Sequence, residues 1–113
     1  MRREEIWRII LDPTLRAETQ KTRPAVIVSE DAKGVLPLRV ILPLTEWKER
    51  CFVIPWLIAI LPNAQYSLEK PSAADSFQIR SVSQERFVQR LGSLDNETIS
   101  QISNAIQIVI GAP

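Results

Sequence analysis

The sequence predicts a mainly β (α+β) protein: several short strands that form a small β-barrel or curled sheet, with one C-terminal amphipathic helix packed against it. Two patterns indicate this class. Short apolar runs are separated by turns rich in proline, aspartate and other polar residues, whereas the end of the chain repeats isoleucine at helical spacing. With 113 residues, 45% hydrophobic and 24% charged, residues 1–113 are expected to form one globular domain.

Three strands are expected in the first half of the chain. Each is a short run rich in Ile, Val and Leu that is followed by a turn signal or a polar segment. The second run, AVIVS, hardly alternates between polar and apolar residues, which indicates a strand buried on both faces or lying in a barrel wall. Pro43 should end the third strand, because proline cannot donate a ladder hydrogen bond. The strands are expected at Glu5–Leu11, Ala25–Ser29 and Leu38–Leu44, with a turn at residues 30–34.

The middle of the chain is harder to divide. FVIPWLIAI, residues 52–60, is apolar throughout, but its proline argues against a central strand, so we expect an edge strand with a bulge or two short strands. AADSFQIRSV, residues 73–82, should form one strand that ends near Ser83. A turn of helix at SQERF and a returning strand at VQRLG, closed by Gly92, should follow.

The last element has clear start and stop signals. Asp95 is expected to cap the helix, and Glu97 lies in the first turn, where the helix dipole favours an acid. Gly111 should end the helix. The apolar stripe of this helix is Ile99, Ile102, Ile106 and Val109.

Composition limits the function classes. Fourteen basic and 13 acidic residues leave a net charge of +1, so any contact with nucleic acid must come from a local patch. The single cysteine, Cys51, excludes an internal disulfide and a cysteine-based zinc site, which suits the reducing cytosol. The longest apolar run is too short and too broken by proline to span a bilayer, and the acids in MRREEIW argue against a signal peptide. We therefore expect a cytoplasmic protein without membrane contact.

The absence of histidine has the widest consequence. It excludes histidine-based triads, paired-histidine ribonuclease mechanisms and nearly all zinc or iron catalytic sites. We expect no metal site and no cofactor. Chemistry must then come from Glu, Asp, Arg, Lys, Thr, Ser or Tyr side chains.

Two segments carry side chains suited to chemistry. Lys21, Thr22 and Arg23 precede Pro24, whose ring favours an extended conformation at Arg23, so this arginine should be held at a strand mouth. Thr45 follows Pro43 at the end of the third strand, at what could be the same barrel end as Arg23. Taken singly, each is more simply explained as a solvated turn or a local turn hydrogen bond.

Together these segments resemble the MazF/PemK toxins of bacterial toxin–antitoxin modules. The resemblance depends on the motifs EIW, LDPT, KTRPAVIVS, PLT, SLEKPS, FQIRSV and RLGSLDNETISQI, which occur in the order and at the spacing of that family. It covers nearly the whole chain. The most specific part is DPT, followed by an acid and then TRP ahead of an apolar strand.

The resemblance implies an SH3-like barrel of the CcdB/MazF/PemK type that forms a homodimer and is covered by a cognate antitoxin. It implies metal-independent cleavage of single-stranded RNA, often at a preferred sequence, by attack of the ribose 2′-hydroxyl on the adjacent phosphate. The products would be a cyclic phosphate and a 5′-hydroxyl. Matched position by position, the family's arginine, hydroxyl residue, loop acid and glutamine are Arg23, Thr45, Glu18 and Gln78.

Elementary chemistry is compatible with these roles. An RNA substrate supplies its own nucleophile, the 2′-hydroxyl, so histidine and metal are dispensable. Arg23 suits the stabilisation of phosphate charge but not proton abstraction, since a guanidinium stays protonated near neutral pH. Glu18, or a water that it orients, is the better base. Thr45 would bond a non-bridging oxygen, and Gln78 would help to seat the strand.

Other side chains are candidates for substrate binding. Trp47, in its polar segment, is a candidate for base stacking, as are Trp56, Tyr66 and Phe77, although core or dimer packing is the plainer explanation and is preferred for Trp7 and Trp56. The candidate phosphate contacts are Lys21, Lys48 and Arg80, together with Arg39 and Arg50; for most of them a solvated surface is the simpler reading.

The chain also departs from the family pattern. The family usually has glycine at the positions of Glu4 and Arg16 and near Ser67, and aspartate at the position of Phe77. Two alternatives follow. The same fold could inhibit a protein target such as gyrase, as CcdB toxins do, or a degenerate toxin could bind only RNA or antitoxin. The motifs KTRP and PLT and the ending QIVIGAP favour the ribonuclease.

Overall fold

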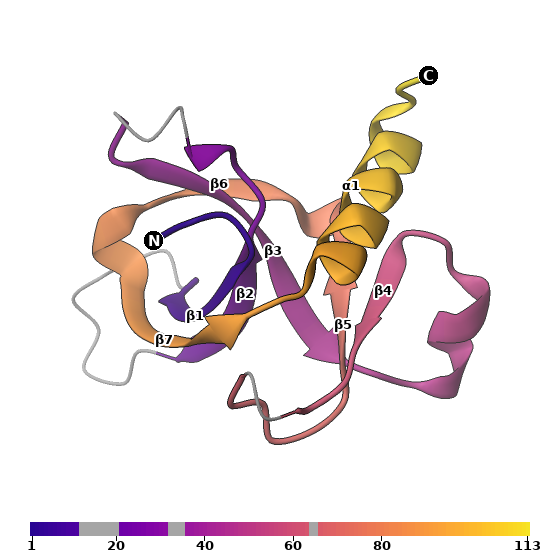
Figure 1. The fold of residues 1–113 in the computed structure, drawn as a ribbon, viewed down its shortest axis with the longest axis horizontal. Helices are drawn as coiled ribbons and strands as arrows, with labels where there is room; N and C mark the ends of the chain where they lie inside the picture. The colour runs from indigo at the N-terminus through magenta and orange to yellow at the C-terminus, as the bar shows by residue number, and fades with distance from the viewer. Residues whose placement is uncertain (12–20, 32–35, 64–65) are drawn as a thin grey trace.

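The computed structural model describes residues 1–11, 21–31, 36–63 and 66–113, which form one curled antiparallel sheet and one C-terminal helix (Figure 1). The sheet has seven strands in the order β4-β5-β3-β2-β1-β7, and β6 pairs with β3 beside this path. Strands and helix are β1 (Glu5–Ile10), β2 (Thr22–Ile27), β3 (Leu38–Glu46), β4 (Leu57–Ile60), β5 (Ser72–Asp75), β6 (Arg80–Ser83), β7 (Phe87–Ser93) and α1 (Asn96–Ile110). Three short 3-10 turns are described: η2 (Glu49–Val53), η3 (Ser76–Gln78) and η4 (Gln84–Arg86).

The expected fold class is confirmed. All pairings between the described strands are antiparallel, and the long strand β3 curls the sheet because it pairs with β6 along its first part and with β5 along its last. Among the described residues the two ends of the path, β4 and β7, do not pair with each other. The sheet is therefore barrel-like without being closed.

Strand alternation divides the core into two clusters on opposite faces of the sheet. On one face, Ile6, Val26 and Leu42 pack with Ile99 and Ile102 of α1. The other face carries a smaller cluster, whose buried members are Ile9, Ala25, Ile27, Ile41 and Val82. We call these the helix-side face and the far face.

Helix α1 begins and ends as expected. The Asp95 carboxylate accepts a hydrogen bond from the Thr98 N–H at 2.8 Å, and Gly111 ends the helix in the left-handed conformation at φ 69°. Ile99 and Ile102 are buried, as is Ala105, which the predicted stripe omitted, whereas Ile106 and Val109 are half-buried. Within the described ranges, no helix is long and apolar enough to cross a bilayer.

Two predicted strand boundaries were wrong, and both errors place candidate residues inside strands. β2 begins at Thr22, so Arg23 is a strand residue paired with Ile9 and not part of a preceding turn. β3 continues through Pro43 to Glu46. The N–H and C=O of Val40 point toward β2. Because these groups alternate in direction along a strand, those of Pro43, three residues later, point toward the other edge of β3. There Pro43 lies in the gap between the residues that pair with β6 and those that pair with β5. No ladder donor is needed there.

Residues 52–60 and 73–82 were also divided incorrectly. The first segment is not a bulged strand or two strands: it contains the end of η2 and then β4, which does lie at a sheet edge. The second is not one strand, because η3 separates β5 from β6. Asp75 explains the break, since its carboxylate accepts from the Phe77 N–H and stabilises a turn in place of a ladder. The predicted helical turn after Ser83 and the strand after it are confirmed as η4 and β7.

Candidate active site on the far face of the sheet

Arg23 and Thr45 lie at the same end of the β2–β3 pair. Ala25 of β2 pairs with Pro43 of β3, and each candidate lies two residues beyond this pair in the same direction. Since alternate residues of a strand share a face, both belong to the far face, with Ala25 and Ile41. The β2–β3 pairing ends at Ala25 and Pro43, and beyond it Arg23 stays paired with Ile9 of β1 and Thr45 pairs with Ala73 of β5. Arg23 and Thr45 thus lie toward one end of neighbouring strands, and their joint contact with a phosphate stays a prediction.

The next strand adds an acid to this row. Thr45 pairs with Ala73 of β5, and Asp75 is two residues further on the same face. Thr45 and Asp75 line one hollow of about 360 Å³. The other lining residues come from the end of β3, η2 and β4: Glu46, Lys48, Arg50, Cys51, Ile54 and Leu57.

Two basic side chains line this hollow, together with the acids Glu46 and Asp75. Lys48 and Arg50, on the segment that holds η2, are both exposed, whereas Cys51 is buried at 5% exposure. The backbone holds this segment locally, because the Cys51 N–H donates to the Lys48 carbonyl at 2.8 Å. Two cations beside a strand-end hydroxyl are suited to an anionic ligand such as a phosphate.

Gln78 is held near the hollow by Asp75. Its Nε2 donates to Asp75 Oδ2 at 2.9 Å, and the Phe77 N–H donates to Asp75 Oδ1 at 3.1 Å. Both Phe77 and Gln78 are exposed. The structure thus brings together Thr45, Lys48 and Gln78 among the predicted site residues.

The remaining predicted residues are more dispersed. Arg80 pairs with Ile41 and so shares the far face, but it lies four residues along β3 from Thr45, about 13 Å at strand spacing. Lys21 is exposed just before β2, and Trp47 is half-buried just after β3. Glu18, the predicted base, lies outside the described residues.

Arg39 does not belong to the phosphate track proposed from the sequence. It lies near the opposite end of β3 from Thr45. Its guanidinium donates to the backbone carbonyls of Met1, Leu36 and Leu38 at 2.8–3.0 Å. These bonds occupy the side chain in holding the N-terminal segment against β3.

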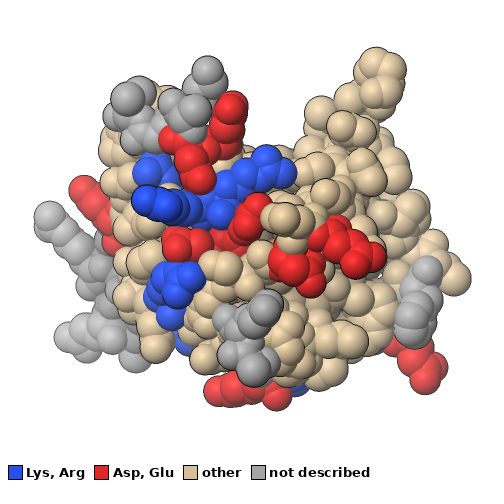
Figure 2. Space-filling view, viewed as in Figure 1, with Lys and Arg blue, Asp and Glu red and all other residues tan. Residues whose placement is uncertain are grey.

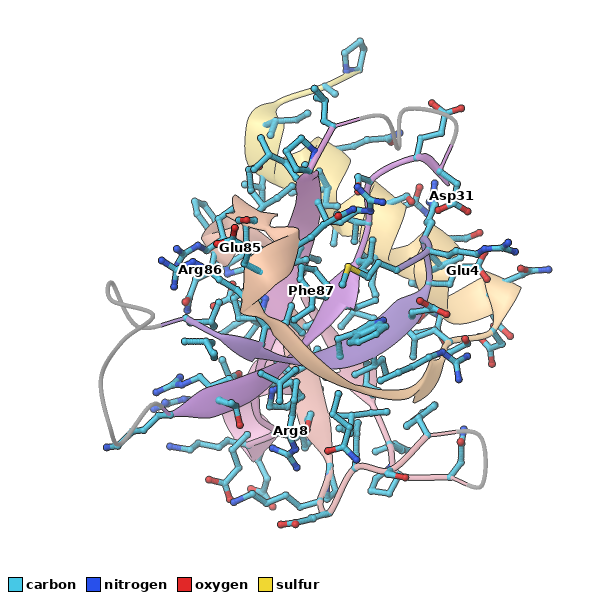
Figure 3. The ribbon with its side chains drawn as sticks, turned by 90° about the vertical axis from the view of Figure 1, so that its left-hand side faces the viewer. Glu4, Arg8, Asp31, Glu85, Arg86 and Phe87 are labelled. Atoms are coloured by element: carbon cyan, nitrogen blue, oxygen red, sulfur yellow. The ribbon has the colours of Figure 1, made fainter. Side chains whose placement is uncertain are left out.

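Two residues near the site were missed by the sequence analysis. Arg8 pairs with Pro24, next to Arg23, and lines a smaller hollow with Lys70 on the helix-side face. Figure 3 shows Arg8 at a part of the sheet remote from Glu4 and Asp31. Asp75 was hidden inside a predicted strand; an aspartate directly ahead of a turn is a capping signal that could have identified it.

Basic and acidic side chains are mixed on one face of the molecule. On the face drawn in Figure 2, Lys and Arg gather at the upper left with Asp and Glu directly beside them. This mixture agrees with the net charge of +1. Attraction of a polyanion therefore depends on local groups such as Lys48 and Arg50.

The family departures are partly explained by the backbone. Glu4 has φ 81°, a conformation that favours glycine, which is the residue usual in the family at this position. Figure 3 shows Glu4 beside Asp31. Phe77 is 59% exposed and packs against Trp56 with ring centroids 4.9 Å apart. Arg16 lies outside the described residues.

A family model decides the chain's relationship to known proteins. The model for PemK-like, MazF-like toxins of type II toxin–antitoxin systems matches residues 2–110. The chain belongs to this family. The resemblance inferred from its motifs is thereby confirmed.

Individual MazF/PemK relatives agree with this assignment. The chain is 30% identical to the endoribonuclease MazF9 of Mycobacterium tuberculosis over 96% of its length and 94% of the relative's. It is 28% identical to the endoribonuclease MazF of Staphylococcus saprophyticus, over 98% and 92% of the two lengths. These names support endoribonuclease activity for the family member described here.

Solved structures share the fold. A mycobacterial endoribonuclease in complex with its cognate antitoxin superposes with a TM-score of 0.79 at 19% identity, covering 100% of this chain and 97% of that one. MazF from Deinococcus radiodurans gives a TM-score of 0.75 at 18% identity, covering 98% and 96%. At these identities the likeness concerns the fold alone.

Proposed function

We propose that this MazF/PemK protein is an endoribonuclease toxin that cleaves single-stranded RNA, such as mRNA, at a preferred sequence without a metal ion. The observation that carries the proposal is the position of Arg23 and Thr45, at one end and on one face of neighbouring strands. A guanidinium and a hydroxyl at these positions are suited to holding one phosphodiester. The names of the relatives support the reaction class.

The proposed reaction begins with the substrate's own nucleophile. The ribose 2′-oxygen attacks the adjacent phosphorus, the bond to the 5′-oxygen breaks, and the products are a 2′,3′-cyclic phosphate and a 5′-hydroxyl. Glu18, or a water that it orients, takes the proton from the 2′-hydroxyl. Solvent returns a proton to the departing 5′-oxygen, so the reaction needs no metal or cofactor.

Arg23 stabilises the charge that grows on phosphate. Its planar fork makes two hydrogen bonds to phosphate oxygens. Thr45 donates its hydroxyl to a non-bridging oxygen from the adjacent strand. The two groups together position the phosphorus for in-line attack.

Substrate binding extends from this pair. Lys48 and Lys21 contact neighbouring phosphates, Arg80 extends the track along the far face, and Gln78 seats the strand. Trp47 is half-buried beside the hollow and offers a surface for base stacking.

The partners follow from the family and its structures. We propose that the protein acts in the cytoplasm as a homodimer and that a cognate antitoxin covers its active face. A relative of the same fold has been solved with its cognate antitoxin, which supports the second part. The antitoxin would inhibit cleavage by competing with RNA for the same cations.

The test uses purified protein, excess EDTA and a mixed RNA substrate whose ends are mapped. We expect cuts that carry cyclic-phosphate and 5′-hydroxyl ends, and no cut where a 2′-deoxy residue replaces the ribose at the preferred site. Arg23→Ala should reduce these cuts by roughly 100-fold or more without changing the melting temperature. Intact RNA with the wild-type protein would contradict the proposal and favour a toxin that acts on a protein target or only binds RNA or antitoxin.

A further inference from the structure

The position of Arg23 depends on β1. Among the described residues, the pairing of β2 with β3 does not reach the first residues of β2, so β3 does not hold them. β1 does, because Ile9 pairs with Arg23 and Ile10 pairs with Thr22. We call these four residues the β1–β2 end. It carries the exposed arginine on which the proposed reaction depends.

The opposite edge of β1 loses its strand partner at the same level. The pairing of β1 with β7 ends where Ile9 meets Phe87, because the residues before Phe87 form the turn η4. The last residue of this turn continues the contact through its side chain: Arg86 Nη1 donates to the Ile10 carbonyl at 3.2 Å. The guanidinium therefore satisfies a backbone acceptor that a longer β7 would otherwise satisfy. Figure 3 shows Arg86 beside Phe87 at the start of β7.

Packing keeps the segment that carries Arg86 in place. Phe87 packs against the far-face cluster, and its ring meets Trp7 with centroids 5.7 Å apart at an interplanar angle of 72°. Ser83 Oγ accepts a backbone N–H of η4 at 3.4 Å. Arg86 itself is half-buried. Its bond to Ile10 therefore restrains the end of β1 against a fixed part of the core.

This restraint matters because two paired strands without further neighbours are only marginally stable in water. Within the described part of the chain, the β1–β2 end lacks β3 on one side and β7 on the other. Without the contact from Arg86 it should open more often than the rest of the sheet. Opening would displace the Arg23 guanidinium, and a misplacement of about 1 Å can cost roughly 100-fold in catalytic rate.

From these contacts we propose that Arg86 is a positioning residue for Arg23. It holds the Ile10 carbonyl, which keeps the β1–β2 end closed and the Arg23 guanidinium directed at the phosphate. Arg86 itself does not contact the RNA. The proposal depends on the proposed role of Arg23 in RNA cleavage.

Three variants isolate the hydrogen-bond donor. Arg86→Met keeps a flexible apolar stem but has no donor, whereas Arg86→Lys restores a charged N–H donor at the end of an unbranched stem. Arg39→Met is the matched control. Arg39 also donates to backbone carbonyls, at 2.8–3.0 Å, but it lies near the opposite end of β3 from Thr45.

The first measurement is steady-state cleavage of an RNA oligonucleotide that contains the mapped cleavage site, at several salt concentrations. For Arg86→Met we expect kcat to fall roughly 10- to 100-fold, with KM and its salt dependence unchanged. Arg86→Lys should recover most of the rate, and Arg39→Met should keep the wild-type kcat. In an Arg23→Ala background, Arg86→Met should cause no further loss.

Three kinetic results would overturn the proposal. An unchanged kcat in Arg86→Met would show that the contact is dispensable. A raised KM with a weaker salt dependence would show that Arg86 contacts RNA phosphates directly. A further loss in the Arg23→Ala background would show that Arg86 does not act through Arg23.

The second measurement, amide hydrogen exchange by NMR, does not need cleavage. Arg86→Met should speed exchange at Ile9 and Arg23 about tenfold and leave Leu42, in the core of β3, unchanged. Arg39→Met should leave all three amides unchanged. Unchanged exchange at Arg23, or equal acceleration at Leu42, would overturn the proposal.

The two measurements separate this inference from the proposed function. If the wild type cuts RNA and exchange at Arg23 does not respond to Arg86→Met, only this inference fails. If exchange responds as expected and the wild type does not cut RNA, the proposed function fails while the restraint of the β1–β2 end by Arg86 holds.

Discussion

Two corners of the molecule use charged side chains in opposite ways. Around Glu5, which is 14% exposed, the carboxylate accepts from the Arg2 N–H at 2.8 Å, Trp7 Nε1 at 3.0 Å and Arg90 Nε at 2.8 Å. At the other corner, and within the described residues, no hydrogen bond occupies the Arg23 guanidinium or the Thr45 hydroxyl. Among the described residues, the Glu5 carboxylate is thus fully hydrogen-bonded within the protein, whereas the Arg23 guanidinium and the Thr45 hydroxyl are left to bind a ligand.

The difference separates stability from binding. Hydrogen bonds to a charged group contribute about 1.5 to 3 kcal/mol each when the group is well paired, so the Glu5 corner should stabilise the junction of β1 and β7. Unpaired charges at an exposed strand end contribute little to folding and remain free for a ligand. Substitutions at the two corners should therefore affect different measurements.

The largest effect is expected from Arg23→Lys. Lysine keeps the charge but loses the planar fork, so single-turnover cleavage should fall by roughly 100-fold or more, while the melting temperature stays within a few degrees. Arg90→Lys is the matched control, because Arg90 pairs with Glu5 and lies outside the site. Arg90→Lys should lower the melting temperature and leave cleavage unchanged. A loss of cleavage without a loss of stability in this control would contradict the separation of the two corners.

Next in size is Glu5→Gln, measured by chemical denaturation. Burial alone would raise the pKa of Glu5, but the hydrogen bonds from Arg2, Trp7 and Arg90 and the charge of the N-terminal amine outweigh it and lower the pKa from 4.5 to about 2. The substitution should cost about 2 to 3 kcal/mol near pH 7, with cleavage retained.

The pH dependence of Glu5 has a definite sign. Because its pKa is lower in the folded state, its contribution is complete above about pH 4.5 and is lost as pH falls toward 2. The stability gap between wild type and Glu5→Gln should narrow over that window. Glu85→Gln, the same exchange at an exposed residue of η4, is the control measured in parallel.

A smaller effect is expected from Thr45→Val. The substitution removes one hydrogen bond to phosphate while keeping a β-branched strand residue, so cleavage should fall about 10- to 100-fold. Thr45→Ser, which restores the hydroxyl, should recover most of the rate. Equal losses in both variants would indicate that the methyl group, not the hydroxyl, matters.

The smallest expected effect concerns Glu4, whose φ of 81° strains a residue with a Cβ. Glu4→Gly should raise the free energy of unfolding by up to about 1 kcal/mol, because relief of strain exceeds the entropy that glycine loses. Glu4→Ala keeps the Cβ and should give no gain. A stabilised Ala variant would assign the effect to the side-chain charge instead.

Prediction from the sequence succeeded where a local signal was compatible with only one structure. Asp95 and Gly111 bounded the helix, and the apolar runs located most strands. It failed where tertiary pairing overrode a local rule: Pro43 did not end β3, because its missing N–H meets a gap between partner strands.

The candidate site shows the same limit. Arg23 and Thr45 were identified as residues, but their shared face depends on a register that no local motif encodes. Asp75 was missed because its partner, Gln78, becomes apparent only when η3 breaks the predicted strand.

The most direct test is a double-mutant cycle on Arg23→Ala and Thr45→Val, measured by single-turnover RNA cleavage. If both side chains hold the same phosphodiester, their effects are coupled, and the double variant should lose little more than Arg23→Ala alone. If the two losses multiply, the residues act independently, and a shared phosphate between β2 and β3 is contradicted.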